Sequence, residues 1–134
     1  MWTLSKPRPV KLIVGILAAD QKCLDAAIAA LALKLGKIDL LSDVWPFNQT
    51  DYYKDQTGGH ILRQFVSIDR LISPGRLAKM KLKTNKLEQK LSEELLLDVH
   101  RPVNLDPGIM EPSKLILAST KNFSHRIYIG KKMY

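Results

Sequence analysis

The sequence is poor in cysteine, in acidic residues and in the glycine-rich loops that bind phosphate. Cys23 is the only cysteine of 134 residues, so this chain can form no internal disulfide, and we expect a reducing, cytoplasmic environment. No apolar stretch approaches the ~18 residues of a membrane span, and no His or Cys spacing fits a zinc site. Neither G-x-x-x-x-G-K-[ST] nor G-x-G-x-x-G occurs. These absences argue against membrane spans, zinc sites and the standard nucleotide-binding loops.

The chain has instead an excess of positive charge on an ordinary globular composition. Its 21 Lys and Arg residues outnumber 13 Asp and Glu residues, which gives a formal net charge of +8. Apolar residues make up 46% and charged residues 25%, and the length fits one domain spanning 1–134. The charge favours phosphate-bearing partners such as RNA, nucleotides or anionic lipids; the alternative is a solvated basic surface.

The hydrophobic pattern predicts an α/β (α+β) domain. We expect two helices, one after Asp20 that ends at Gly36 and one that starts at Ser73-Pro74 and ends near Leu96. The order β-α-β-β-α-β predicts a ferredoxin-like split βαβ sandwich with both helices on one face of the sheet; a doubly wound sheet is the alternative. The predicted strands are 10–19, 38–44, 60–68, a short 103–105 and a C-terminal 125–130, while 111–119 fits either a helix or a strand.

Two polar clusters are candidate ligand sites. In the loop 45–59, Asp51 lies beside Tyr52 and Tyr53, which suits a hydroxyl-rich or basic ligand; the alternative is a loop anchored by buried tyrosines. In the second helix, Lys81, Asn85 and Glu88 fall within a narrow arc at ~100° per residue. This polar stripe borders the apolar face of the helix, and Thr84 lies just inside that face. A stripe in this position can face a cleft. The alternative is a solvated flank.

Two further stretches near the C-terminus carry polar candidates. His125 and Arg126, on the predicted last strand, supply an acid/base group and an anion-binding fork. In RPVNLDPG (101–108), Asp-Pro-Gly fits a type II turn, with Pro fixing φ and Gly supplying φ > 0. We predict that this turn presents Asn104 and Asp106.

Five blocks together resemble an uncharacterised prokaryotic family, domain of unknown function 4416: KPRPVKLIVGIL, TDYY, KLKTNKLE, RPVNLDPG and KLILASTKNFSHRIYIG. The resemblance extends over nearly the whole chain. Some relatives are labelled "GTP-binding protein". Relatives also continue past the position of Tyr134, so the C-terminal part of the family is expected to be absent here. The family pattern falls on Asp51, Tyr52, Tyr53, Lys81, Thr84, Asn85, Glu88, Asn104, Asp106, Pro107, Gly108, Lys114, Thr120, Lys121, Ser124, His125 and Arg126.

The leading hypothesis is a cytoplasmic protein that binds a phosphate-bearing small molecule or nucleotide, with catalysis on that ligand left open. Lys81, Lys121 and Arg126 would hold the anion. His125, Glu88 or Asp106 would do acid/base work, and Asp51 and Asp106 would orient the ligand or a metal ion. One alternative is an RNA-binding module that uses the basic helix with Tyr52, Tyr53 and Phe123 as stacking surfaces; another is a protein-interaction subunit.

Overall fold

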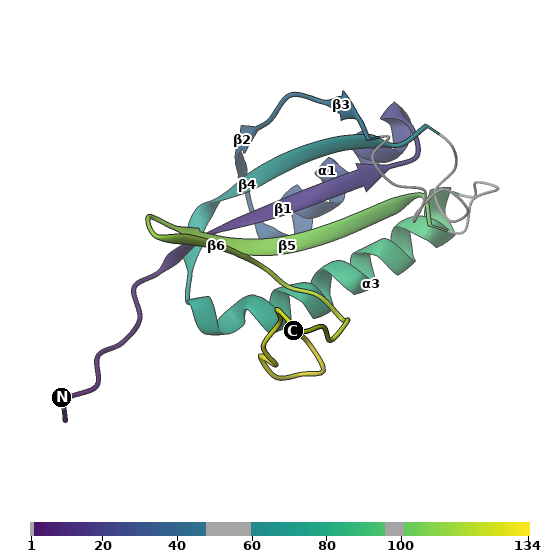
Figure 1. Cartoon of the computed structure of the whole chain (residues 1–134). Helices are drawn as coiled ribbons and strands as arrows, with labels where there is room; N and C mark the ends of the chain where they lie inside the picture. The colour runs from purple at the N-terminus through teal and green to yellow at the C-terminus, as the bar shows by residue number, and fades with distance from the viewer. Residues whose placement is uncertain (1, 48–59, 96–100) are drawn as a thin grey trace.

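The computed structural model describes residues 2–47, 60–95 and 101–134 (Figure 1). In these residues, two α-helices and a 3-10 turn accompany one β-sheet, which confirms the predicted α+β class. The elements are β1 (Val10–Ala18), α1 (Gln21–Leu35), β2 (Ile38–Leu41), β3 (Trp45–Pro46), β4 (Leu62–Ile72), η1 (Pro74–Arg76), α3 (Leu77–Leu95), β5 (Val103–Glu111) and β6 (Lys114–Leu117).

The sheet has the strand order β2-β4-β1-β5-β6, with β3 paired to β4. Every pair of neighbouring strands is antiparallel, which excludes the doubly wound alternative, because that fold needs a mainly parallel sheet. The crossovers β1-α1-β2 and β4-α3-β5 correspond to the connectivity of a split βαβ unit. The finer ferredoxin-like assignment stays a prediction.

Strand β1 is the centre of the sheet, as its continuous apolar run predicts. Leu12, Val14 and Ile16 pack with both helices in one core, while Ile13 and Leu17 are buried on the opposite face. A strand buried on both faces needs mostly apolar side chains, which explains the continuous apolar run of β1. In the part of the chain that the structure describes, no helix is both long and apolar enough to cross a membrane.

Helix α1 begins and ends where the sequence predicts. The Asp20 carboxylate accepts a hydrogen bond of 2.7 Å from the Cys23 backbone N–H, and Gly36 ends the helix at φ +123°, a conformation that favours glycine. Burial raises the pKa of the Cys23 thiol to about 11, so the thiol stays protonated at neutral pH. Cys23 packs in the core.

Helix α3 also follows the prediction closely. Pro74 opens a 3-10 turn that continues into the helix, although the Ser73 side chain makes no capping hydrogen bond. The predicted apolar seam is buried against the sheet; it comprises Leu77, Met80, Leu87 and Leu91. Because this seam fixes the rotation of α3, it also decides where the polar flanks of the helix lie.

Four predicted strands have different bounds or do not form, and the short strand predicted at 103–105 is part of the longer β5, Val103–Glu111. Residues 125–130 are not a strand: they lie in an irregular segment whose only pairing is an isolated bridge between Gly130 and Met133. The third strand runs from Leu62 to Ile72, and the second ends at Leu41. The ambiguous stretch after Glu111 is resolved as the strand β6, which forms a hairpin with β5.

The predicted Asp-Pro-Gly turn is wrong, because β5 runs straight through it. Asp106, Pro107 and Gly108 pair with Gly15, Val14 and Ile13 of β1. The Pro107 carbonyl points away from β1 and accepts a hydrogen bond from the Ala118 N–H. An N–H at this position would point to the same side, so proline removes no hydrogen bond to β1 and is tolerated. Gly108 is needed for space: an added Cβ would lie 2.8 Å from the backbone oxygen of Ile116.

Candidate ligand-binding cleft

The cleft opens where β6 separates from β5. The paired positions end at Gly108 and Leu117, and one further bond of 3.0 Å joins the Ala118 N–H to the Pro107 carbonyl. The following segment 119–134 closes on itself, because Ser119 and Tyr134 exchange two backbone hydrogen bonds of 2.6 and 2.7 Å. The first half of β5 therefore has an edge without a neighbouring strand, which faces α3 (Figure 1).

Two side chains of α3 satisfy this open strand edge. The Glu88 carboxylate accepts the Leu105 N–H at 2.6 Å, and the Lys81 ammonium donates to the Leu105 carbonyl at 3.0 Å. Lys81 and Glu88 are seven residues apart, which is about two helical turns, so they reach β5 from the same side of α3. They replace the ladder hydrogen bonds that β6 would otherwise supply, and they join the helix to the strand.

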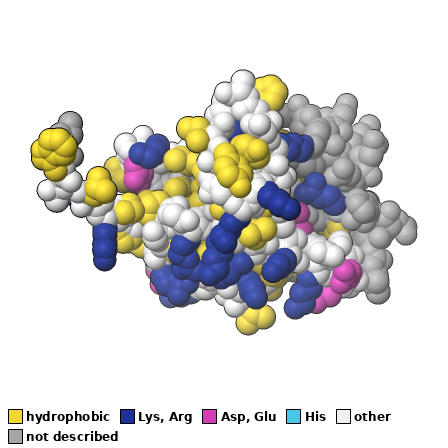
Figure 2. All heavy atoms as spheres, turned by 90° about the horizontal axis from the view of Figure 1, so that it is seen from below, with side chains coloured by type: hydrophobic (Ala, Val, Ile, Leu, Met, Phe, Trp, Pro, Cys, Tyr) yellow, Lys and Arg dark blue, Asp and Glu magenta, His cyan; other side chains and the backbone are white. Residues whose placement is uncertain are grey.

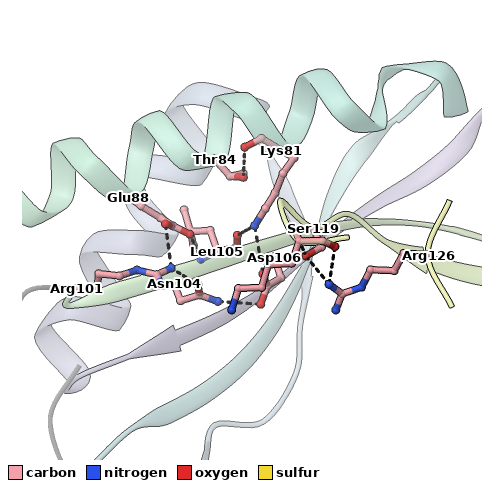
Figure 3. Close-up of polar contacts among 10 residues, drawn as sticks. Lys81, Thr84, Glu88, Arg101, Asn104, Leu105, Asp106, Ser119 and Arg126 are labelled. Carbon is pink, nitrogen blue, oxygen red and sulfur yellow. Dashed lines mark hydrogen bonds and ion pairs between the residues drawn. The ribbon is translucent and has the colours of Figure 1, made fainter. Parts of the chain in front are cut away.

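The hydrogen-bond network continues onto β5 (Figure 3). Asn104 and Asp106 lie two residues apart and point to the same face of the strand, where the Asn104 amide donates to the Asp106 carboxylate at 2.8 Å. Lys81 lies 3.3 Å from the other Asp106 oxygen. Arg101 joins α3 to β5 in this network. It pairs with Glu88 at 3.2 Å and also donates to Oδ1 of the Asn104 side chain.

Burial shapes the electrostatics of this network. Lys81 is 6% exposed and Asn104 is 3% exposed, whereas the Asp106 side chain is 28% exposed. Burial raises the pKa of the Glu88 carboxyl, an effect opposed by the hydrogen bond from Leu105 and by the charge of Arg101. Asp106 is thus the acidic group of the network that remains open to a ligand.

The outer wall of the cleft holds a positioned arginine. Nη1 of Arg126 donates to the Ser119 hydroxyl at 3.0 Å and to the Lys121 carbonyl at 2.8 Å (Figure 3). Among the described residues, its Nη2 and Nε groups have no hydrogen-bond partner. His125 is exposed beside it and contacts the edge of Phe123, with ring centroids 5.3 Å apart. This wall therefore offers an oriented guanidinium and an imidazole.

The two walls enclose a cleft of about 1080 Å³. Four basic side chains line it against two acidic ones, which leaves a positive balance. Apolar residues also line it: Leu115, Ile116, Leu117, Ala118, Ile127 and Ile129. Eight of the residues proposed from the sequence also line it: Lys81, Asn85, Glu88, Asn104, Asp106, Lys121, His125 and Arg126.

The remaining candidates do not line the cleft or cannot be placed. Thr84 is fully buried, and its hydroxyl donates to the Lys81 carbonyl at 3.0 Å, so it packs beneath the cleft. Asp51, Tyr52 and Tyr53 lie outside the described residues. Arg101 was missed by the sequence reasoning, although it opens the string RPVNLDPG; its position beside a polar strand start was the available signal.

The family model described as "Domain of unknown function (DUF4416)" matches residues 8–134. The chain belongs to this family. Searches of the curated proteins and of the solved structures each returned no match. In the described parts of this DUF4416 chain, no group of three or more His, Cys, Asp or Glu side chains is arranged to hold a metal ion.

Proposed function

We propose that the cleft between α3, β5 and residues 118–134 binds a phosphate-bearing small molecule, and that this molecule is a nucleotide. The observation that carries the proposal is the pairing of a positively charged region with apolar lining residues in one cleft of about 1080 Å³. Small-molecule sites of this size typically combine apolar lining with a few convergent polar groups.

The phosphate end would lie against Lys121, His125 and Arg126. A guanidinium binds phosphate best with two parallel N–H groups, and Arg126 has Nη2 and Nε available while Nη1 is held by Ser119 and Lys121. That hold fixes the side chain before a ligand arrives, which lowers the entropy cost of binding.

The other end of the ligand would lie against the apolar lining residues. Leu115, Ile116 and Ile127 expose apolar surface to the cleft, which suits the faces of a planar ring and not inorganic phosphate alone. Asp106 keeps an exposed carboxylate next to this surface and is suited to accept hydrogen bonds from ligand hydroxyl groups. A phosphate, a polar middle and an apolar ring together describe a nucleotide.

Acid/base chemistry in the cleft would fall to His125 and Asp106. Both carboxylates of the network accept hydrogen bonds at each oxygen, but the Glu88 side chain is 14% exposed and that of Asp106 is 28% exposed, so Glu88 is better suited to holding β5 in place. His125 is exposed, and its imidazole can serve as an acid or a base. Analysis of the nucleotide after the same binding experiment tests whether the protein converts it to a product.

The test is a binding titration with purified protein and a panel of GTP, ATP, GMP and inorganic phosphate. Calorimetry should show micromolar binding of at least one nucleotide and weaker binding of inorganic phosphate. Arg126→Ala and Asp106→Asn should each weaken binding at least tenfold, whereas the matched control Arg70→Ala, on β4 and outside the cleft, should leave it unchanged. The proposal fails if no nucleotide binds, or if the control weakens binding as much as Arg126→Ala does.

A further inference from the structure

The flank of α3 turned away from the cleft is a basic stripe. Its four lysines follow one another at intervals of three and four, and at ~100° per residue they occupy an arc of roughly 60°. They extend about 16 Å along the helix. Arg76, in the 3-10 turn η1 just before α3, adds a cation at the N-terminal end. We name this surface the basic flank; it comprises Arg76, Lys79, Lys83, Lys86 and Lys90.

Neighbouring elements add to this charge. The pKa of Lys83 is lowered, first by burial and then by the positive charges of Lys79, Arg76, Lys34 and Arg70. Lys34 comes from the end of α1 and Arg70 from β4, so three elements supply cations to one surface. Figure 2 shows dark blue side chains gathered over the face of the molecule seen from below.

Most of these charges are not compensated within the described parts of the chain. No ion pair joins Arg76, Lys79, Lys83 or Lys86 to an acidic side chain there; Lys90, at the end of the basic flank, pairs with Glu94 at 3.7 Å. Like charges at helical spacings of three and four repel one another. A bound polyanion would remove this repulsion, which makes the surface complementary to closely spaced negative charges.

We propose that the basic flank binds nucleic acid through its phosphate backbone, independently of the nucleotide cleft. Neither α1 nor α3 contains an aromatic residue, so this surface has no platform for stacking bases and would contact phosphates without reading sequence. A rigid helix with a cation every 5–6 Å is suited to the regular, dense charge of a duplex backbone.

The same surface is less suited to a lipid bilayer. Helices that lie in a membrane surface present large apolar side chains beside their basic ones, and these enter the acyl region. The large apolar side chains of the α3 seam, among them Leu77, Met80 and Leu87, are instead buried in the core. Insertion of α3 into lipid would require the domain to open.

The test is a fluorescence-anisotropy titration of a labelled 20-base-pair RNA duplex of arbitrary sequence with the full chain. Lys79→Glu/Lys83→Glu should weaken binding at least tenfold. Lys131→Glu/Lys132→Glu makes the same change in net charge in the exposed C-terminal segment and should weaken binding less than threefold. With about five phosphate contacts, the affinity should fall by about two to three orders of magnitude between 50 and 200 mM salt.

Three results would overturn the proposal. The first is an equal loss in both double variants, which would mean that only the net charge matters. The second is a duplex affinity that does not depend on salt. The third is no duplex binding by a chain that binds phosphatidylserine vesicles, which would assign the basic flank to a membrane surface. Arg126→Ala should leave duplex binding unchanged, so a failure here is distinguishable from a failure of the nucleotide cleft.

Discussion

The two polar flanks of α3 have opposite electrostatic characters. On one flank, Lys81 and Glu88 are largely buried and make hydrogen bonds to β5, and each has a partner of opposite charge. On the other flank, Lys79 and Lys83 have like-charged neighbours, and no ion pair compensates them among the described residues. One helix thus carries a flank that holds the fold together and a flank whose charges are left for another molecule.

The comparison teaches how to tell structural charges from charges available to a ligand. Removing one member of a buried, hydrogen-bonded pair leaves its partner unsatisfied and is costly. Removing a charge from a repulsive, solvated cluster costs almost nothing and relieves repulsion. Stability measurements should therefore separate the two flanks before any ligand is known.

The largest effect is expected from Glu88→Ala. It leaves the Leu105 N–H without its acceptor and removes the ion-pair partner of Arg101, so urea unfolding should show a loss of about 3 kcal/mol. Glu88→Gln keeps an acceptor for Leu105 and should lose clearly less. The control is Glu94→Ala, which removes an exposed pair and should change stability by less than about 0.5 kcal/mol. Equal losses at positions 88 and 94 would remove the distinction between buried and exposed pairs.

Gly108→Ala should have the next largest effect, because the cleft depends on the close contact of β6 with β5. The new Cβ would lie 2.6 Å from Cδ2 of Leu117 and 2.8 Å from the Ile116 backbone oxygen. We expect a loss of about 2 kcal/mol in unfolding free energy and weaker nucleotide binding, with duplex binding retained. Gly75→Ala is the control, since its Cβ would meet only the Ser73 hydroxyl at 3.8 Å. An unchanged stability of the Gly108 variant would contradict this account of the strand pair.

A smaller effect should appear in the pH dependence of the cleft flank. The pKa of Glu88 in the folded protein lies above its ordinary value of 4.5, so between these two pH values the folded state holds more protons than the unfolded state. The contribution of Glu88 to stability is therefore full below pH 4.5 and is lost as the pH rises through the folded pKa. Unfolding curves at pH 4 and pH 7 should show the wild type losing stability relative to Glu88→Gln. A constant difference between the two proteins would argue against the raised pKa.

The smallest effect is expected on the basic flank. Lys83→Gln should leave stability unchanged or raise it by a few tenths of a kcal/mol at low salt, because it removes repulsion from Lys79 and Arg76. The gain should disappear in 0.5 M salt, because the salt already screens the repulsion between these charges in the wild type. Lys132→Gln, outside this cluster, serves as the control and should show no salt-dependent gain. A loss above 1 kcal/mol would mean that Lys83 has a structural partner.

The sequence predicted best where local pattern and burial agree. The run from Val10 to Ala18 and the seam of α3 have periodicities that only one packing satisfies, and both were predicted correctly. The stripe of Lys81, Asn85 and Glu88 lines the cleft, because the rotation of the helix follows from that seam.

The prediction was wrong where a neighbouring strand overrides a turn signal. Asp-Pro-Gly has the chemistry of a turn, yet β1 pairs along its whole length and the missing donor of Pro107 points away from that partner. His125 to Gly130 alternates like a strand, but it pairs with no strand of the sheet in the described part of the chain. Sequence spacing could not show that Arg101 links Glu88 to Asn104, because that contact depends on how the helix and the strand meet.

The closed loop of residues 119–134 has a consequence for how the cleft can vary. Its two ends are joined by the backbone pair of Ser119 and Tyr134, which does not depend on the side chains between them. The hydrogen bonds that hold Arg126 also lie within residues 119–134, so the wall that carries His125 and Arg126 is held by contacts inside this segment. Substitutions or changes of length there would alter ligand preference while the rest of the domain keeps its stability, so this loop is the natural starting point for changing specificity by directed evolution.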